Sequence, residues 1–229
     1  MGRSFSDKII RSQSEFKLSI ICHCFIFTVA MRLNLIEHIL INNPLRQLVQ
    51  YLFEARKLLH MGGRADNGHV LEIGCGSGAG IDLIFSAFGA ATVDAFDLDP
   101  QVVGRAMQRH AGNIGNVRLW VGNVRHIPVP DGWYDAVFNF GVLHHVQRWR
   151  SALDEIYRVL KPGGRFYCEE ILKKYITHPV FRRLLYHPQY DRFDQSELST
   201  ALGGAGFHVK DTAELFDLYG WFIADKPIK

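Results

Sequence analysis

Apolar and polar positions alternate in a regular way along most of this chain, as short apolar runs followed by longer amphipathic runs. From residue 69 onward the apolar runs predict strands at 69–73, 92–97, 117–121, 134–140, 165–171, 207–212 and 215–224. The runs with helical spacing predict helices at 79–88, 100–111, 148–160 and 195–205. Alternation of strand and helix is typical of a parallel sheet that helices cover on both faces. Because no helix separates the last two strands, we expect an antiparallel hairpin at one edge of the sheet.

The segment before the first strand has a pattern of its own. Asn43–Pro44 predicts the start of an amphipathic helix that continues to Leu59 and ends at Gly62–Gly63. Residues 62–68 are then a linker. We therefore expect an apolar N-terminal segment at 1–31, a helical extension at 32–66 and a main domain at 67–229.

Two further local patterns predict element ends. Asp194 and Glu197 form the pattern of a capping box at the start of the last helix. Gly163–Gly164 follows Lys161–Pro162 and predicts a turn that leads into the fifth strand.

The N-terminal segment admits several interpretations. Basic residues precede an apolar stretch at 18–31, which resembles a signal peptide but lacks a convincing cleavage site. The stretch is short for a membrane span, which needs about 20 apolar residues. Met31 could be the true start, with 1–30 dispensable; alternatively the stretch is a buried or partner-docking helix, or it contacts a membrane.

Composition narrows the class of protein. The chain has 229 residues, 48% of them hydrophobic, which is enough for one good core, and its 21% of charged residues gives no indication of long disorder. A net charge of +3 permits an anionic substrate without calling for nucleic acid. The four cysteines form no C-x-x-C pair, so we expect a reduced, cytoplasmic protein without structural disulfides or a metal site.

A glycine-rich turn follows the first predicted strand, in the sequence EIGCGSGAG at 72–80. The glycines Gly74, Gly76 and Gly78 allow positive φ angles and let a ligand approach the backbone amides. The acid Glu72, just before the first glycine, would not help to bind a pyrophosphate. It would suit a ligand with a positively charged amino-acid end, so the turn favours a cationic nucleoside.

Polar residues also end the next three predicted strands. Asp97 ends the second strand, where a carboxylate can accept both ribose hydroxyls, Asn123 follows the third, and residues 139–145 follow the fourth. Ligands of open α/β sheets bind beyond the carboxyl ends of the strands, so these residues converge on one crevice. The glycines with Ala79 also fit a dinucleotide fingerprint, and Asp97 or Asp99 would serve the ribose of NAD equally well.

Four runs together carry a more specific resemblance. VLEIGCGSGAG, AFDLDP, VGNVRHIPVPDGWYDAVFNFGVLHHV and LDEIYRVLKPGGRFY occur in this order over roughly residues 67–170. In order and spacing they resemble class I S-adenosylmethionine-dependent methyltransferases, closest to the branch of ubiquinone and menaquinone biosynthesis. The resemblance implies an α/β, Rossmann-like fold with a seven-stranded, mostly parallel sheet, helices on both faces and one antiparallel edge strand.

The resemblance also implies a cofactor, S-adenosyl-L-methionine, and the residues that bind it. The glycine loop would hold the methionine end, with Glu72 near its ammonium group; Asp97 would bind the ribose hydroxyls and Leu98 would pack on the adenine. Asn123 stands where the family usually has aspartate, so we expect weaker cofactor binding, although Gly122–Asn123 is also common turn chemistry. The full expected set of cofactor-binding residues is Glu72, Gly74, Cys75, Gly76, Gly78, Asp97, Leu98, Asn123, Val124 and Asn139.

Two neighbouring histidines are the candidate catalytic residues. His144 and His145 follow the fourth strand, where acceptor and methyl group should meet, and the pKa of histidine suits a general base. A base is needed only if the acceptor carries a proton at neutral pH. The pair could instead pack on the cofactor or cap the next helix, and the sequence does not distinguish one histidine from the other.

Residues 172–193 mix aromatic and basic side chains and resemble the family least. We expect a lid over the crevice that shapes acceptor choice, with a solvated helix as the plain alternative. Nucleic acid is disfavoured, because residues 139–142 read NFGV in place of the Asn/Asp-Pro-Pro-aromatic motif of base amino methylation. The expected function is methyl transfer to a small-molecule or lipid-like acceptor. A nicotinamide-dependent oxidoreductase and a non-catalytic cofactor-binding module remain as alternatives.

Overall fold

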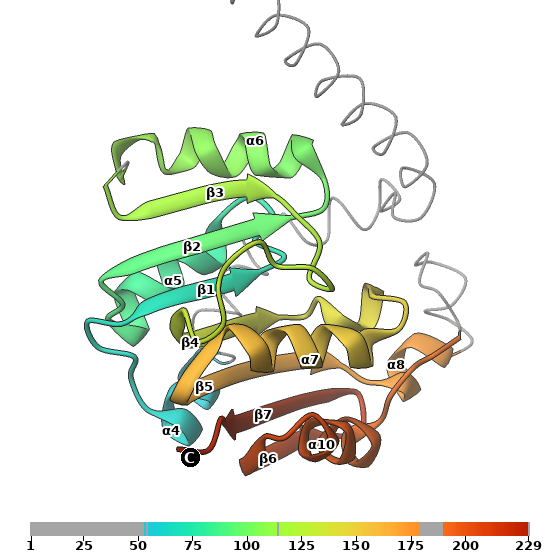
Figure 1. Cartoon of the computed structure of the whole chain (residues 1–229). Coiled ribbons are helices and arrows are strands. Elements are labelled where there is room, and N and C mark those ends of the chain that lie inside the picture. The colour runs from blue at the N-terminus through green and yellow to red at the C-terminus, as the bar shows by residue number, and fades with distance from the viewer. Residues whose placement is uncertain (1–52, 54, 114, 179–189, 229) are drawn as a thin grey trace, which may run out of the picture.

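The computed structural model describes residues 53, 55–113, 115–178 and 190–228, and a single seven-stranded sheet runs through them (Figure 1). The strands lie in the order β3-β2-β1-β4-β5-β7-β6. Their bounds are β1 His69–Ile73, β2 Thr92–Asp97, β3 Val117–Val121, β4 Tyr134–Phe140, β5 Leu160–Ile171, β6 His208–Leu215 and β7 Tyr219–Asp225. The pairs among β1 to β5 are parallel, whereas β7 is antiparallel to both β5 and β6. The antiparallel part of the sheet therefore lies at the expected edge, with the reversed strand β7 second from it.

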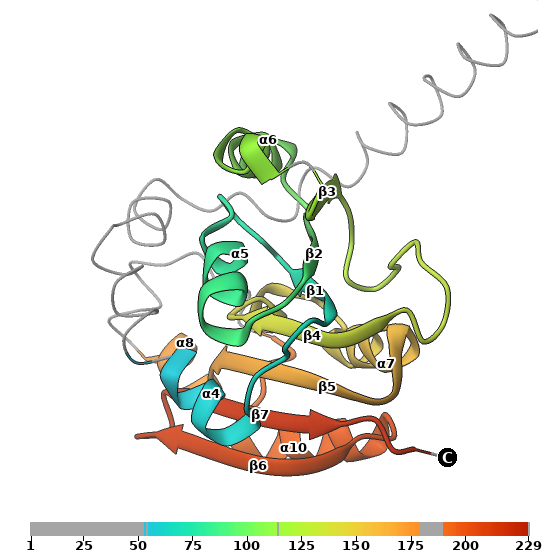
Figure 2. The same ribbon diagram turned by 90° about the vertical axis from the view of Figure 1, so that its left-hand side faces the viewer.

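Helices cover both faces of this sheet (Figure 2). One face carries α4, α5 and α6, and the other carries α7 and α10. The bounds are α4 Ala55–Gly62, α5 Ala79–Leu83, α6 Pro100–Arg109, α7 Trp149–Val159, α8 Lys173–Thr177 and α10 Gln195–Gly204. A π-helical turn, Ile84–Phe88, extends α5, and the 3₁₀ turns are Ala111–Asn113 and η4 Leu143–His145.

The buried strands explain the two hydrophobic cores. Successive side chains of a strand point to opposite faces, so each central strand supplies both cores. Leu71 and Val137 pack under α7, whereas Val70 and Ala136 pack under α5. Because the middle of the sheet is covered on both sides, its polar side chains are confined to the strand ends, where ligands bind in such folds.

The fifth strand begins earlier than predicted. β5 starts at Leu160, which pairs with Tyr134, and the Lys161–Gly164 segment remains within the strand. Here the N–H of Gly163 donates to the carbonyl of Lys226 (2.8 Å), and the N–H of Lys226 donates to Gly164 (2.9 Å). The predicted turn at Gly163–Gly164 is therefore an irregular start of the strand, held by the end of the chain.

The last hairpin also differs in its bounds, although not in its existence. Its turn lies at Phe216 and Asp217, whose φ angles are 56° and 59°, and the N–H of Leu218 donates to the carbonyl of Leu215 (2.9 Å). Two non-glycine residues with left-handed backbone give no composition signal of a turn. This is why the predicted boundary fell earlier, at 212–215. The capping box of Asp194 and Glu197 is confirmed.

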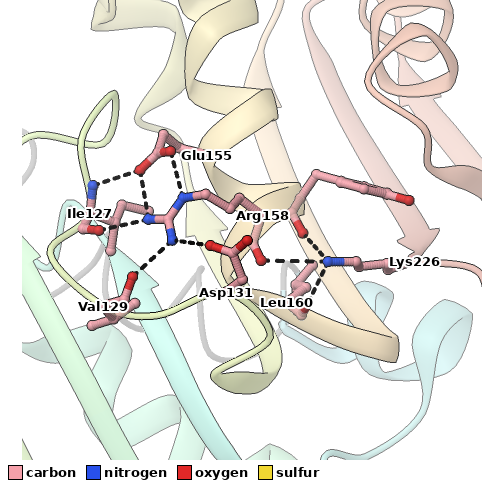
Figure 3. A network of polar contacts seen from close by, with 8 residues as sticks. Ile127, Val129, Asp131, Glu155, Arg158, Leu160 and Lys226 are labelled. Carbon is pink, nitrogen blue, oxygen red and sulfur yellow. Dashed lines mark hydrogen bonds and ion pairs between the residues drawn. The ribbon is translucent and has the colours of Figure 1, made fainter.

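A network of polar contacts fixes the loop between β3 and β4 to α7 (Figure 3). The guanidinium of Arg158 donates to both carboxylate oxygens of Glu155, to Asp131, and to the carbonyls of Ile127 and Val129. Because Asn123 begins this loop, the network limits how far the loop can move beside the strand ends.

Within the described residues, none of the helices has the length and apolar character that crossing a membrane requires. The apolar segment at 1–31 lies outside the described residues, as does most of the predicted helix at 45–59. The part that is described, α4, ends at Gly62, next to the predicted stop.

Candidate functional site

The glycine-rich turn opens toward free space at one position. Gly74, Gly76 and Gly78 have φ angles of 66°, 50° and 87°. A Cβ on Gly74 would lie 2.3 Å from a methyl carbon of Val142, and one on Gly78 would lie 2.8 Å from His110 Nε2. A Cβ on Gly76 would meet nothing within 4 Å. Protein packing therefore explains two of the glycines, and the third borders space that a ligand can fill.

Asp97 lies next to this space, at the end of β2. Its Oδ2 accepts the N–H of Gly76 and its Oδ1 accepts the N–H of Asp99, each at 3.0 Å. Burial raises the pKa of Asp97, and the hydrogen bonds from Asp99 and Gly76 oppose that shift. Each carboxylate oxygen has accepted one of these hydrogen bonds and retains capacity for another. Asp97 is therefore oriented by the backbone and still able to accept two hydroxyl groups.

Glu72 is buried beneath the turn, with 2% of its surface exposed. Its Oε2 has no hydrogen-bond partner within the part of the chain that the structure describes. Burial raises the pKa of Glu72 well above its ordinary value, and the charges of Asp97 and Asp82 add to the shift. A buried carboxylate oxygen without a partner is costly, and a hydrogen-bond donor, best one that carries a positive charge, would satisfy it.

The two acids belong to one site. β1 and β2 pair in parallel with Glu72 opposite Ala95, so Asp97 follows two positions further along the neighbouring strand. Asp97 is the largest charge contribution to the shift of Glu72. Gly80 leaves room for Glu72, because a Cβ there would lie 1.9 Å from Oε1.

Three other expected cofactor residues have more limited access. Cys75 is 4% exposed, and burial raises the pKa of its thiol, so it is an inert packing residue. Val124 is 5% exposed and packs in the core, which leaves only its backbone for a ligand. Asn123 uses its Oδ1 to accept the N–H of Arg125 (2.9 Å), the turn chemistry that its position after Gly122 suggested. By contrast, Leu98 is exposed (41%) beside Asp97.

The side chain of Asn139 is fully buried, and both its amide nitrogen and its oxygen form hydrogen bonds within the protein. Its amide nitrogen donates to Glu170 Oε1 (2.7 Å) and to the carbonyl of Glu169 (3.1 Å), while its Oδ1 accepts the N–H of Val142 (3.2 Å). These contacts engage the Asn139 side chain within the protein, and its part in cofactor binding stays a prediction. Asn139 holds the turn after β4 against the end of β5.

Glu170 is the centre of this second cluster, and the sequence did not identify it. It is fully buried, and its Oε1 accepts the N–H groups of Val142 (3.0 Å) and Leu143 (2.6 Å). Burial raises the pKa of Glu170 to about 7, against the effect of these hydrogen bonds. One signal in the sequence was the pair Glu169–Glu170 at the carboxyl end of the fifth predicted strand, because a buried strand normally contains no acidic residues.

The two candidate histidines differ in their surroundings. His144 is buried, and its Nδ1 lies 2.7 Å from Oε2 of Glu170. His145 is half-buried, and its ring centroid lies 4.1 Å from that of His144. His144 is therefore fixed by a carboxylate, and His145 is the more accessible ring. Within the residues that the structure describes, no group of three or more histidine, cysteine or acidic side chains could hold a metal ion.

The sequence of this chain is similar to those of known methyltransferases. Residues 71–168 match the family model described as a methyltransferase domain. A probable S-adenosylmethionine-dependent methyltransferase of Mycolicibacterium smegmatis is 32% identical over 169 residues, 72% of this chain and 63% of that protein. A demethylmenaquinone methyltransferase of Lactiplantibacillus plantarum is 33% identical over 153 residues, 59% of this chain and 64% of that protein. In each comparison the matched region spans less than two thirds of the relative.

Solved structures share the fold. A SAM-dependent methyltransferase from Aquifex aeolicus superposes with a TM-score of 0.64 at 22% identity, over 78% of this chain and 92% of that one.

Proposed function

We propose that this protein is a class I S-adenosylmethionine-dependent methyltransferase, since residues 71–168 match the methyltransferase-domain family model, and that it transfers a methyl group from S-adenosyl-L-methionine to a small-molecule or lipid-like acceptor. The observation that carries the proposal is that two acids, Glu72 and Asp97, lie close together at the turn whose Gly76 borders open space. This arrangement offers one acceptor for a cation and two for hydroxyl groups.

The residues of the turn fit the cofactor group by group. Glu72 Oε2, which lacks a partner among the described residues, would accept from the ammonium of the methionine end. The backbone from Gly74 to Gly78 would follow that end, with Gly76 giving it room. Asp97 would accept the two ribose hydroxyls, since each of its oxygens already holds one backbone N–H and has capacity left.

The adenine would lie between Leu98 and the start of the loop after β3. Leu98 offers an exposed apolar surface for a ring. Asn123 would accept the adenine amine through the remaining capacity of its Oδ1, without the charge of an aspartate. We therefore propose that the cofactor is bound, and bound more weakly than an aspartate would allow.

The cofactor would supply a methyl group already activated by its sulfonium. The protein then has to align the acceptor and exclude water, and a base is needed only for an acceptor with a proton to lose. His145 is the candidate for that base, because its ring is more accessible than that of the buried His144. If the acceptor carries no such proton, the pair serves only to shape the site.

The acceptor is proposed from the relatives and from the apolar character of the chain. The Lactiplantibacillus relative is named for demethylmenaquinone, a quinone with a hydrophobic tail. A lipid-like acceptor of this kind would be consistent with the aromatic residues at 172–193, whose flanks lie at the carboxyl end of β5 in the structure. Residues 179–189 of the predicted lid lie outside the described residues.

Cofactor binding is the first experiment. Thermal shift and calorimetry of the full chain should show that S-adenosylmethionine and S-adenosylhomocysteine bind and that NAD(H) does not. A response to NAD(H) without any to S-adenosylhomocysteine would overturn the proposal in favour of an oxidoreductase. Cofactor binding without transfer of labelled methyl to quinone, phenol, fatty-acid and amine acceptors would favour a non-catalytic module.

The organisation and location of the chain are tested separately. We propose that 67–229 is the catalytic domain, with 32–66 a helical extension, and that the protein is cytoplasmic; membrane contact through residues 18–31 is a separate alternative for the N-terminal segment. Comparison of the full chain with one that begins at Met31, by cofactor affinity and by flotation with vesicles, tests both points. Equal flotation of the two chains would contradict membrane contact through this segment.

A further inference from the structure

A buried arginine, Arg192, lies near Glu170 and has no hydrogen-bonding partner among the described residues. Arg192 is 7% exposed, and none of its three guanidinium nitrogens forms a hydrogen bond within the described part of the chain. Buried charges in proteins are normally paired, because an unpaired one loses its hydration without compensation. Burial lowers the pKa of Arg192, while Asp191 and Glu170 act in the opposite direction.

The neighbours of Arg192 in the chain fix its place. Asp191 Oδ2 accepts the N–H of Arg148 (2.9 Å), and the ring of Phe193 packs edge-on against Trp149 with centroids 4.7 Å apart. The carbonyl of Phe193 accepts the N–H of Lys173 (2.9 Å). Arg192 therefore lies between two segments, the one that follows His145 after β4 and the one that follows Glu170 after β5.

Neither nearby acid is available to pair with it. Asp191 is bound by the N–H of Arg148 and by Arg150, whose Nη1 lies 3.2 Å from Oδ1. Glu170 accepts hydrogen bonds from Asn139, from the turn after β4 and from His144. The sequence of residues 179–189, PVFRRLLYHPQ, contains no acidic residue. The segments that flank Arg192 therefore supply no free acidic partner for it.

A guanidinium offers donors in a planar fork that matches a carboxylate or a phosphate, and it keeps its charge when buried. We propose that Arg192 binds an anionic group, a carboxylate or a phosphate, on the methyl acceptor. The inference rests on the proposed function, because it places this group next to the histidines where acceptor and methyl group would meet. It also narrows the acceptor to an acidic or phosphorylated amphiphile.

The experiment measures the preference for an anionic head group. The full chain with saturating S-adenosylhomocysteine is titrated with decanoate, decyl phosphate and decanol, which share one chain length. We expect at least one of the two anions to bind about tenfold or more tightly than decanol, as a charge-assisted pair implies. A preference for decanoate identifies a carboxylate site, and a preference for decyl phosphate identifies a phosphate site.

Variants test whether Arg192 is responsible. Arg192→Gln should remove the preference, Arg192→Lys should retain part of it, and Arg105→Gln, which removes an exposed arginine on α6, should leave it unchanged. Equal binding of the three probes by the unmodified protein would overturn the inference, even if Arg192→Gln does not fold. An unaltered preference in a folded Arg192→Gln variant would also overturn it. Failure of S-adenosylhomocysteine to bind would instead overturn the proposed function.

Discussion

Nδ1 of His144 lies 2.7 Å from Oε2 of Glu170, at the carboxyl ends of the neighbouring strands β4 and β5. The same carboxylate accepts the N–H groups of the turn that carries His144, so the histidine and its turn are fixed together. Glu170 thus determines the shape of the site between the two strand ends. We regard it as a positioning residue, since it acts through the turn and through His144.

The first prediction concerns how Glu170 makes stability depend on pH. Burial raises its pKa to about 7 from an ordinary value of 4.5, so between these values the folded protein keeps a proton that the unfolded chain releases. The free energy of unfolding therefore falls as the pH rises through this window. Urea denaturation measures the free energy of unfolding of the Glu170→Gln variant minus that of the unmodified protein. This difference should rise by about 2–3 kcal/mol between pH 5 and pH 8, because glutamine does not titrate.

Glu155→Gln is the matched control for this experiment. The side-chain hydrogen bond from Arg158 contributes most to lowering the pKa of Glu155, so its stabilising effect is lost only as the pH falls below its ordinary value. Its difference from the unmodified protein should stay constant between pH 5 and pH 8. If the free energy of unfolding of Glu170→Gln also differed from that of the unmodified protein by a constant amount, Glu170 would not titrate in this range.

The second prediction concerns the ribose. Asp97→Ala removes the carboxylate that would accept the ribose hydroxyls and should weaken S-adenosylhomocysteine binding by about 1–3 kcal/mol, measured by calorimetry. Asp99→Ala is the control, because the Asp99 side chain caps α6 through the N–H of Gln101 (2.8 Å). It should cost about 1 kcal/mol of stability and little affinity. Unchanged affinity in Asp97→Ala would contradict the ribose assignment.

The third prediction concerns the space that Glu72 occupies. A Cβ on Gly80 would lie 1.9 Å from Glu72 Oε1, so Gly80→Ala should reduce the free energy of unfolding by about 1–3 kcal/mol. The double variant with Glu72→Ala should recover most of this loss, which thermal denaturation can measure.

Gly104→Ala provides the comparison for that experiment. Gly104 also lies within a helix, α6, and a Cβ there would meet nothing within 4 Å. This variant should be about 0.5–1 kcal/mol more stable, the ordinary gain of alanine over glycine in a helix. If both glycine variants gained stability equally, the close contact between Glu72 and Gly80 would be refuted.

The sequence predicted the sheet well for a physical reason. The strands β1 to β4 are short and bounded by glycine or polar residues, so their apolar runs coincide with the strands. β5 was harder, because the Lys161–Gly164 segment has turn composition, while its hydrogen bonds come from Lys226 at the other end of the chain. A contact so distant in sequence leaves no local pattern.

The sequence identified those site residues that a glycine-rich turn or a predicted strand end marks. Positive φ angles and close contacts call for glycine at Gly74 and Gly78, and such positions can be recognised. Glu170 and Arg192 could not be recognised, because their significance lies in burial and in the presence or absence of partners. A charged residue at the end of a strand is usually solvated, and only packing shows that these two are not.

The last prediction concerns Asn123, at the proposed adenine position. Its Oδ1 accepts the N–H of Arg125 at 2.9 Å, and an aspartate could keep this hydrogen bond while adding a charge. Since charge-assisted hydrogen bonds are stronger than neutral ones, Asn123→Asp should tighten S-adenosylhomocysteine binding by about 1 kcal/mol, or roughly fivefold. Calorimetry with sinefungin, which also carries an adenine, should show the same gain. Asn123→Ala provides the opposite change, because it removes the acceptor and the turn hydrogen bond together, and it should weaken binding. Looser binding by Asn123→Asp, at unchanged stability, would place the adenine elsewhere.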